Sequence, residues 1–305
     1  MMKMRNLYLM IALLTAAPLV LSGSNDKGDD ILEKLIENHK KQREGITEMK
    51  IIKDDAVSYE KWEEKDGKTV YKWREERNVN GQKQISVFDG ETYYTRNPMT
   101  GQVEKTEDKN INPLHFYQSL QNLDCEYQGE VDVDGVKCHV LVAENVPMED
   151  VAGITNASGS DEENEQMDMQ DAEVDVHLYV DDKRWVIPKM VLETEDMGQG
   201  DAGGMFSKAR IEVKNSDFRK VSGMFIAYQT VSSTSFKKTP EGKKKSDEMK
   251  KAMNNMSPEE REMMEERMGE ASGMLEDEGM QTETRIEKVE INEGFSDDLF
   301  DGDNL

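Results

Sequence analysis

The chain has 305 residues, of which 34% are charged and 36% hydrophobic, and its formal net charge is −25 at pH 7. A chain this acidic repels phosphate backbones and anionic lipid surfaces, which argues against a nucleic-acid-binding protein. The small hydrophobic fraction indicates that part of the chain is solvated or that the apolar face of the fold is thin.

The N-terminus has the layout of a secretory signal. Lys3 and Arg5 precede an apolar run and a group of small residues that ends at Ser24. We expect residues 1–24 to be a signal peptide cleaved near Ser24, which leaves residues 25–305 in the periplasm without a stable transmembrane anchor. The alternative, an uncleaved anchor, conflicts with the length of the run, because a membrane span needs ~20 apolar residues. Loss of the two cations would take the net charge from −25 to about −27.

Apolar periodicity predicts a helix and then a meander of strands. The apolar residues between Ile31 and Ile36 recur on one helical face, so we expect a helix over residues 31–43. Short alternating runs follow, with Asp66-Gly67 and Asn80-Gly81 as tight hairpin turns. The strands expected here are 57–62, 70–79 and 85–88, and a short helix is expected over 112–123.

A second set of alternating runs predicts more strands. They are 127–133, 136–143, 174–180, 185–193, 209–213, 224–235 and 284–291. Together with the first set they would form an antiparallel sheet of about ten strands, which is near the limit for an open sheet and should therefore curl.

Two segments interrupt the strand pattern. Residues 158–171 are acidic and lack aromatic side chains, which predicts a disordered loop. Residues 237–281 predict a helical insertion with an apolar stripe of methionines, namely Met249, Met253, Met256, Met264 and Met268. Such a stripe is typical of helix packing, of an adaptable lid or partner surface, or of monovalent copper binding, and the sequence leaves the three open.

The two cysteines, Cys125 and Cys138, flank a predicted hairpin turn at Asp134-Gly135. An exported protein favours a disulfide, but a two-residue turn places Cys138 opposite Val131 rather than opposite Cys125. A bulge would be needed to bring the thiols together. A disulfide and two buried free thiols both remain open.

Several stretches resemble the family of the periplasmic outer-membrane lipoprotein carrier LolA. The likeness lies in the helix at 31–43, the run 89–94 with the Asn97-Pro98 turn, the paired segments 179–181 and 185–189, the run 218–223, and the terminal segment 289–300. The resemblance implies an α+β fold that is mainly antiparallel β, a curved, incomplete half-barrel with helices over its concave face. The Met-rich insertion is a departure from the minimal carrier.

The resemblance implies that the concave face binds acyl chains, and alternating strand positions supply candidates for its lining. These are Val57, Tyr59, Trp62, Val70, Trp73, Phe88, Tyr93, Leu178 and Trp185. The same residues would equally form a filled core, since alternation does not separate a cavity wall from packed core.

Motifs for catalysis are missing from the sequence. The four histidines show no metal-binding spacing, and there is no nucleophile elbow or phosphate-binding loop. We therefore expect no enzyme, cofactor or metal site, and a carrier or binding protein for lipid or lipid-modified cargo. The alternatives are an envelope protein that docks a partner through its Met-rich helices, and a copper-binding protein.

Overall fold

The computed structural model describes residues 24–79, 81–106, 119–147, 151, 173–194, 206–257 and 279–305. The predicted signal peptide up to residue 23, the acidic loop 158–171, most of the helix expected at 112–123 and part of the insertion, with Met264 and Met268, lie outside these residues. No helix within the described ranges combines the length and apolar character that crossing a membrane requires.

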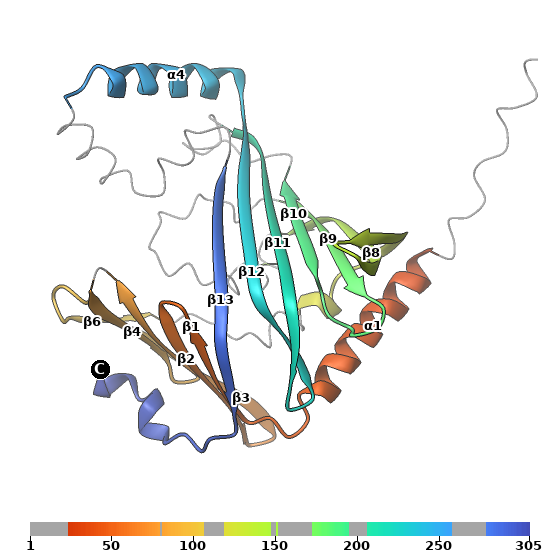
Figure 1. Ribbon diagram of the computed structural model, residues 1–305, viewed down its shortest axis with the longest axis vertical. Helices are drawn as coiled ribbons and strands as arrows, with labels where there is room; N and C mark the ends of the chain where they lie inside the picture. The colour runs from red at the N-terminus through yellow and green to blue at the C-terminus, as the bar shows by residue number, and fades with distance from the viewer. Residues whose placement is uncertain are drawn as a thin grey trace, which may run out of the picture.

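Within the described ranges, thirteen antiparallel strands form a single sheet (Figure 1). They are β1 (Glu48–Lys53), β2 (Ala56–Lys65), β3 (Lys68–Val79), β4 (Gln82–Phe88), β5 (Tyr93–Arg96), β6 (Val103–Thr106), β7 (Glu126–Val133), β8 (Val136–Pro147), β9 (Glu173–Asp181), β10 (Lys189–Thr194), β11 (Phe206–Val221), β12 (Met224–Lys238) and β13 (Met280–Ile291). The strand order is β6-β5-β4-β3-β2-β1-β13-β12-β11-β10-β9-β8-β7.

The sheet is bent and open. In Figure 1, β1–β4 run steeply across the long strands β11–β13, and the outermost strands of the order, β6 and β7, do not pair with each other. This confirms the predicted α+β, mainly antiparallel half-barrel, with more strands than the roughly ten expected.

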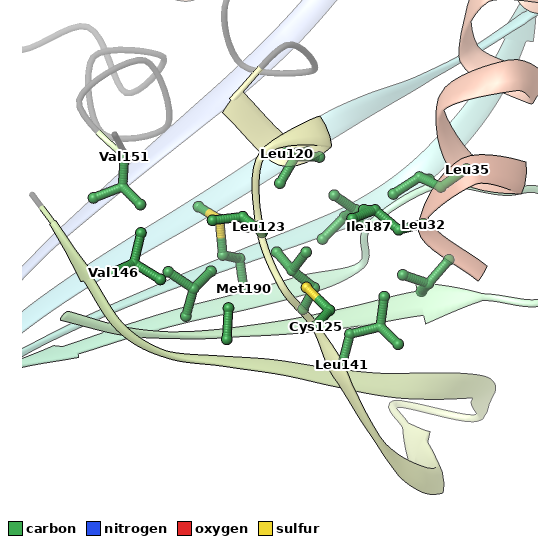
Figure 2. Close-up of a cluster of buried hydrophobic side chains, with 14 of the residues drawn as sticks. Leu32, Leu35, Leu120, Leu123, Cys125, Leu141, Val146, Val151, Ile187 and Met190 are labelled. Atoms are coloured by element: carbon green, nitrogen blue, oxygen red, sulfur yellow. The ribbon is translucent and has the colours of Figure 1, made fainter. Parts of the chain in front are cut away.

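Helix α1 (Ser24–Gln42) lies at one end of the sheet and packs against β7 and β12. Its apolar stripe, Ile31 to Ile36, meets buried residues of β8, β9 and β10 and the segment that ends at Cys125 (Figure 2). Gly28 lets the helix approach the backbone at Cys125 closely, because a Cβ at this position would lie 1.9 Å from the carbonyl oxygen of Cys125. We call the face of the sheet that α1 covers the helix face.

The C-terminal segment 292–305 covers the opposite face, which we call the tail face. The rings of Tyr59 and Phe295 meet edge to face at 5.5 Å, and Arg74 donates a hydrogen bond to the carbonyl oxygen of Leu299 at 3.1 Å. Phe300 is 1% exposed. A short 3₁₀ turn, η2 (Asp297–Phe300), brings Asp297 to 2.7 Å from the ammonium of Lys61. A second, η3 (Gly302–Asn304), follows it.

The longest strands, β11 and β12, form a hairpin that ends in helix α4 (Pro240–Asn254). Thr239 caps this helix by accepting a hydrogen bond from the backbone N–H of Gly242 at 2.9 Å, and Pro240 occupies its first turn. In Figure 1, α4 lies at the end of β12 that is far from β1–β4.

Two local differences from the sequence prediction have physical causes. β10 begins at Lys189 rather than at residue 185, because Asp181 and Val186 close a turn in which Trp185 has a φ of 54°. β1, β5 and β6 were not among the expected strands, since each is short and carries little apolar alternation.

Candidate functional site

The two halves of the helix face differ in how they are filled. On the β7–β10 half, α1 completes a packed core in which Leu35, Leu120, Leu141 and Leu178 are fully buried. Figure 2 shows this core, with the chain from Leu120 to Cys125 lying over the strands. Leu178, predicted to line a cavity, is therefore part of a filled core.

The β1–β5 half carries an aromatic patch, which consists of Trp62, Tyr71, Trp73, Phe88 and Tyr93. Trp62 and Tyr71 pair directly across β2 and β3 with ring centroids 5.6 Å apart, and Trp73 stacks on Tyr93 at 6.3 Å. Trp62, Tyr71 and Phe88 are buried, whereas Trp73 and Tyr93 are only partly buried. The patch thus presents aromatic surface at its β3–β5 side.

Aliphatic side chains extend the patch across β1, β13 and β12. They are Met49, Ile51, Met224, Ile226, Val289 and Ile291. Ile51, Ile226, Val289 and Ile291 are partly buried, so apolar side chains run along this half of the sheet, interrupted by Glu60 between Met49 and Trp73.

A row of hydroxyl side chains separates the patch from the packed core. Thr230, Ser232 and Thr234 follow Ile226 and the buried Tyr228 at every second position of β12, and Thr230 and Ser232 pair with Thr284 and Thr282 of β13. The middle of the helix face is therefore polar but uncharged, with apolar surface on both sides.

Arg43 lies over the patch from the loop after α1. Its guanidinium stands 3.8 Å from the ring centre of Trp62, a cation–π contact. The indole N–H of Trp62 is buried and has no hydrogen-bond partner among the residues that the structure describes. An unpaired buried donor costs about 1–3 kcal/mol, which makes this N–H a point where a bound oxygen would be favoured.

Two carboxylates on the helix face have opposite pKa shifts, namely Glu60, which lies within the patch beside Trp73, and Glu75, which is two positions after Trp73 on β3. Burial raises the pKa of Glu60 to about 7, although Arg43 and Lys53 act against this. Burial would also raise the pKa of Glu75, but Lys53 and Arg77, with a hydrogen bond from Ser58, lower it below its ordinary value. Glu60 therefore changes charge near neutral pH, whereas Glu75 stays ionised.

The registers divide the nine predicted lining residues between the two faces. Trp62, Trp73, Phe88 and Tyr93 lie on the helix face, in the patch. Val57, Tyr59 and Val70 lie on the tail face, because β2 and β3 run without a bulge and positions of opposite parity point oppositely. The nine residues therefore do not share one lining, and Trp185, in the turn after β9, packs against the β7–β10 core.

Two hollows lie away from the patch. A groove of about 620 Å³ runs between α1 and residues 121–124, with a mainly acidic rim that includes Asp29, Glu33 and Glu37. A second hollow of about 370 Å³ lies where β11, β12 and α4 meet. Neither is lined by any of the nine predicted residues.

The cysteines are both free and fully buried. Cys138 pairs with Val131, as the hairpin turn predicted, and a bulge near Gly129 moves Glu126 opposite Val142 without bringing Cys125 to Cys138. Of the two possibilities left open by the sequence, the structure has two buried free thiols.

The described methionines of the insertion lie in or just after α4. Met249 is 37% exposed, and Met253 and Met256 are partly buried. They share a helix side with Gly242 and Ser246, so this side of α4 is buried near the start of the helix and exposed at Met249.

The described histidines have ordinary structural surroundings. Burial, and then the charge of Arg43, lowers the pKa of His39 to about 3, and burial lowers that of His177. His139 lies 3.6 Å from Glu130. Within the described ranges, no three His, Cys, Asp or Glu side chains are grouped to hold a metal ion.

No family model and no curated protein matches the chain. Among solved structures, a domain from Vibrio parahaemolyticus described as an outer membrane lipoprotein-sorting protein is 11% identical over 92% of this chain and 98% of its own, with a TM-score of 0.44. A DUF1329 family protein from Desulfovibrio piger is 14% identical over 91% and 97%, with a TM-score of 0.45. The Mycobacterium tuberculosis lipoprotein LppX is 9% identical over 60% and 92%, with a TM-score of 0.31.

By its own architecture the chain is an α+β protein built on an open, curved antiparallel sheet with a helix on one face. This is the incomplete-barrel arrangement that the LolA resemblance implied. Because every TM-score above is below 0.5, the function proposed next rests on this chain's own residues.

Proposed function

We propose that the chain is a non-enzymatic binding protein for lipid or lipid-modified cargo, which it holds against the aromatic patch. The observation that carries the proposal is the apolar surface on the β1–β5 half of the helix face, where Trp73 and Tyr93 remain partly exposed. Surface of this kind favours apolar ligands, since each buried methylene contributes about 0.8 kcal/mol.

The neighbouring polar groups suit the rest of an amphiphile. The hydroxyl row lies farther along β12 and β13 than the apolar residues Met224 and Ile226 that extend the patch. We therefore place acyl chains on the patch and the polar headgroup toward the hydroxyl row.

Lipid binding is tested on purified residues 25–305. Organic extraction followed by mass spectrometry is expected to find co-purified acyl lipid, and a fluorescent fatty acid is expected to bind saturably. A protein that is free of lipid and does not bind the probe saturably would overturn the proposal.

A matched pair of variants locates the site. Trp73→Ala removes partly exposed aromatic surface from the patch and is expected to weaken probe binding about tenfold, the effect of losing about 1.4 kcal/mol. Tyr59→Ala removes an aromatic of similar burial from the tail face and should leave binding unchanged. Equal losses in the two variants would place the site elsewhere.

The proposed setting is the periplasm, after cleavage of the signal near Ser24. Its support is the basic and apolar layout of the first residues. N-terminal sequencing of the exported protein is expected to begin at Ser24 or Asn25. An intact Met1 on the exported protein would contradict cleavage.

A second candidate function is partner docking through the insertion, which the exposed Met249 favours. Deleting residues 237–281 is expected to leave fatty-acid binding intact under the lipid proposal. If the deletion abolished capture of an envelope partner while lipid binding persisted, docking would be a separate role of this segment. Copper binding predicts stoichiometric uptake of monovalent copper, which the same deletion would remove.

A further inference from the structure

The hollow between β11, β12 and α4 is lined mainly by cations, and we call it the basic pocket. Its volume is about 370 Å³, and its lining is Lys208, Arg210, Ser235, Phe236, Lys237, Lys238 and Lys243. Five of these seven residues are basic, in a chain whose net charge is −25. The lining residues place the pocket at the α4 end of the hairpin. Figure 1 shows this end of the hairpin far from β1–β4.

The strand register gathers these cations at one end of the sheet. Lys208 pairs with Lys237, and Arg210 pairs with Ser235, so the three cations lie side by side across β11 and β12. Glu193 of β10 holds two of them, with Lys208 at 3.0 Å and Arg210 in direct contact. Glu212 also pairs with Arg210 at 2.7 Å, so two carboxylates hold and partly neutralise Lys208 and Arg210.

Two of the three remaining cations of the lining, Lys237 and Lys243, are less compensated. Lys237 and Lys243 are both exposed, and among the described residues no carboxylate lies within salt-bridge distance of either ammonium. Adjacent like charges repel each other, by amounts that grow as solvent is removed. An anion seated between them would relieve this repulsion.

The walls of the pocket are rigid. Lys238 is buried, and its ammonium lies 3.3 Å from the hydroxyl of Ser246, which ties β12 to α4. Phe206 and Phe236 pack with ring centroids 5.0 Å apart. The pocket is thus built before any ligand arrives, so little ordering is needed on binding.

The N-terminus of α4 adds to the positive electrostatic potential of the basic pocket. The helix begins at Pro240, directly beside Lys237 and Lys238, and the partial positive charge of a helix N-terminus favours anions. Residues 237–251 contain seven lysines and three acidic residues, which opposes the acidic balance of the whole chain. Cations from β11, β12 and α4 therefore converge on one hollow.

We propose that the basic pocket binds a phosphate group carried on a small polar molecule. Phosphate offers several acceptor oxygens at once, which suits several ammonium groups arranged around a hollow. The basic pocket is separate from the aromatic patch, so this proposal does not depend on whether the chain carries lipid. Its ligand is either a free phosphate ester or the phosphate of a lipid headgroup.

The test measures binding of glycerol 3-phosphate and inorganic phosphate to residues 25–305 by calorimetry. The double variant Lys237→Ala/Lys243→Ala is expected to weaken binding at least about tenfold. The matched control is Lys65→Ala/Lys68→Ala, which removes two exposed lysines from the β2–β3 hairpin and should leave binding unchanged. Added salt should weaken binding by the intact protein.

Vesicle co-sedimentation separates the two sources of phosphate. Binding to phosphatidylglycerol vesicles but not to phosphatidylcholine vesicles, lost in the double variant, supports a lipid headgroup. Binding of the soluble phosphates alone supports a free ester. Absence of binding in both arms, or equal binding by the double variant and the wild type, overturns the proposal.

The lipid-binding proposal and the phosphate-binding proposal are tested by different variants, so one can fail without the other. Fatty-acid binding should be unchanged in Lys237→Ala/Lys243→Ala, and phosphate binding should be unchanged in Trp73→Ala. A loss of phosphate binding in Trp73→Ala would contradict a pocket that is independent of the patch.

Discussion

The guanidinium of Arg43 lies 3.8 Å from the ring centre of Trp62, so the loop after α1 is stacked on the aromatic patch. The same charge acts against the raised pKa of Glu60 and helps to lower the pKa of His39. One side chain therefore joins the end of the helix to the patch and to its titrating groups.

Arg43→Ala is expected to lower the free energy of unfolding by about 1–2 kcal/mol, because a partly desolvated cation–π contact over Trp is lost. Chemical denaturation followed by tryptophan fluorescence measures the change. Arg43→Lys keeps the charge but loses the planar stacking, so it should fall between the wild type and Arg43→Ala. Unchanged stability in Arg43→Ala would show that the stacking contributes nothing.

Stability should fall as the pH rises from about 4.5 to about 7, because of Glu60. Its pKa is about 7 in the folded protein against an ordinary value of 4.5, so the folded state holds the proton over this range while the unfolded chain releases it. The loss is complete above pH 7 and is about 3 kcal/mol at most. Glu60→Gln should therefore stabilise the protein at pH 8 and have little effect at pH 4.

Glu75→Gln is the contrasting variant. Burial opposes ionisation of Glu75, but the nearby cations have the larger effect, so the pKa of Glu75 in the folded protein is lowered. The ionised side chain therefore stabilises the fold above its ordinary pKa, and this stabilisation is lost as the pH falls below that value. Glu75→Gln is expected to destabilise the protein at pH 8 by about 1–3 kcal/mol. Identical pH profiles for both variants would refute the opposite shifts.

Gly28→Ala is expected to destabilise the protein by about 2 kcal/mol or more, although alanine is intrinsically the better helix former by about 1 kcal/mol. The added Cβ would lie 1.9 Å from the carbonyl oxygen of Cys125, and backbone atoms move only at high cost. Thermal unfolding measures the effect. Glu33→Ala, at an exposed position of α1, is the control and should change stability by less than about 0.5 kcal/mol.

The two thiols should be unreactive in the folded protein and both titratable after unfolding. Burial raises the pKa of Cys125 to about 12 and that of Cys138 to about 11, so almost no thiolate is present at neutral pH. Alkylation followed by intact mass measurement counts the free thiols. A denatured, unreduced protein that takes up no alkyl group would reveal a disulfide instead.

The strand pattern of the sequence predicted most of the sheet. Val174 to Val180 alternate cleanly because only one side of β9 meets the core, and this strand was placed within one residue at each end. β1 was not predicted because Lys50 and Lys53 flank the adjacent Ile51 and Ile52, so apolar and polar residues do not alternate clearly along it. Its place beside β13 depends on pairing across more than 200 residues, which local propensity does not encode.

The site was predicted in part. Trp62, Trp73, Phe88 and Tyr93 were named from the sequence and do meet in one patch. Tyr59 was grouped with them although it lies three residues from Trp62 in an unbroken strand, and strict parity would have assigned it to the other face. The basic pocket was not predicted, since its cations come from β11, β12 and α4 and only the register brings them together.

The most direct test of lipid binding is photolabelling of residues 25–305 by a fatty acid with a diazirine on its acyl chain, with the labelled peptides identified by mass spectrometry. Labels are expected in β3, β4 and β5, around Trp73, Phe88 and Tyr93, and excess unlabelled fatty acid should abolish them. Labels confined to the tail face around Tyr59 and Phe295, or labelling that unlabelled fatty acid does not compete, would contradict a cargo site on the aromatic patch.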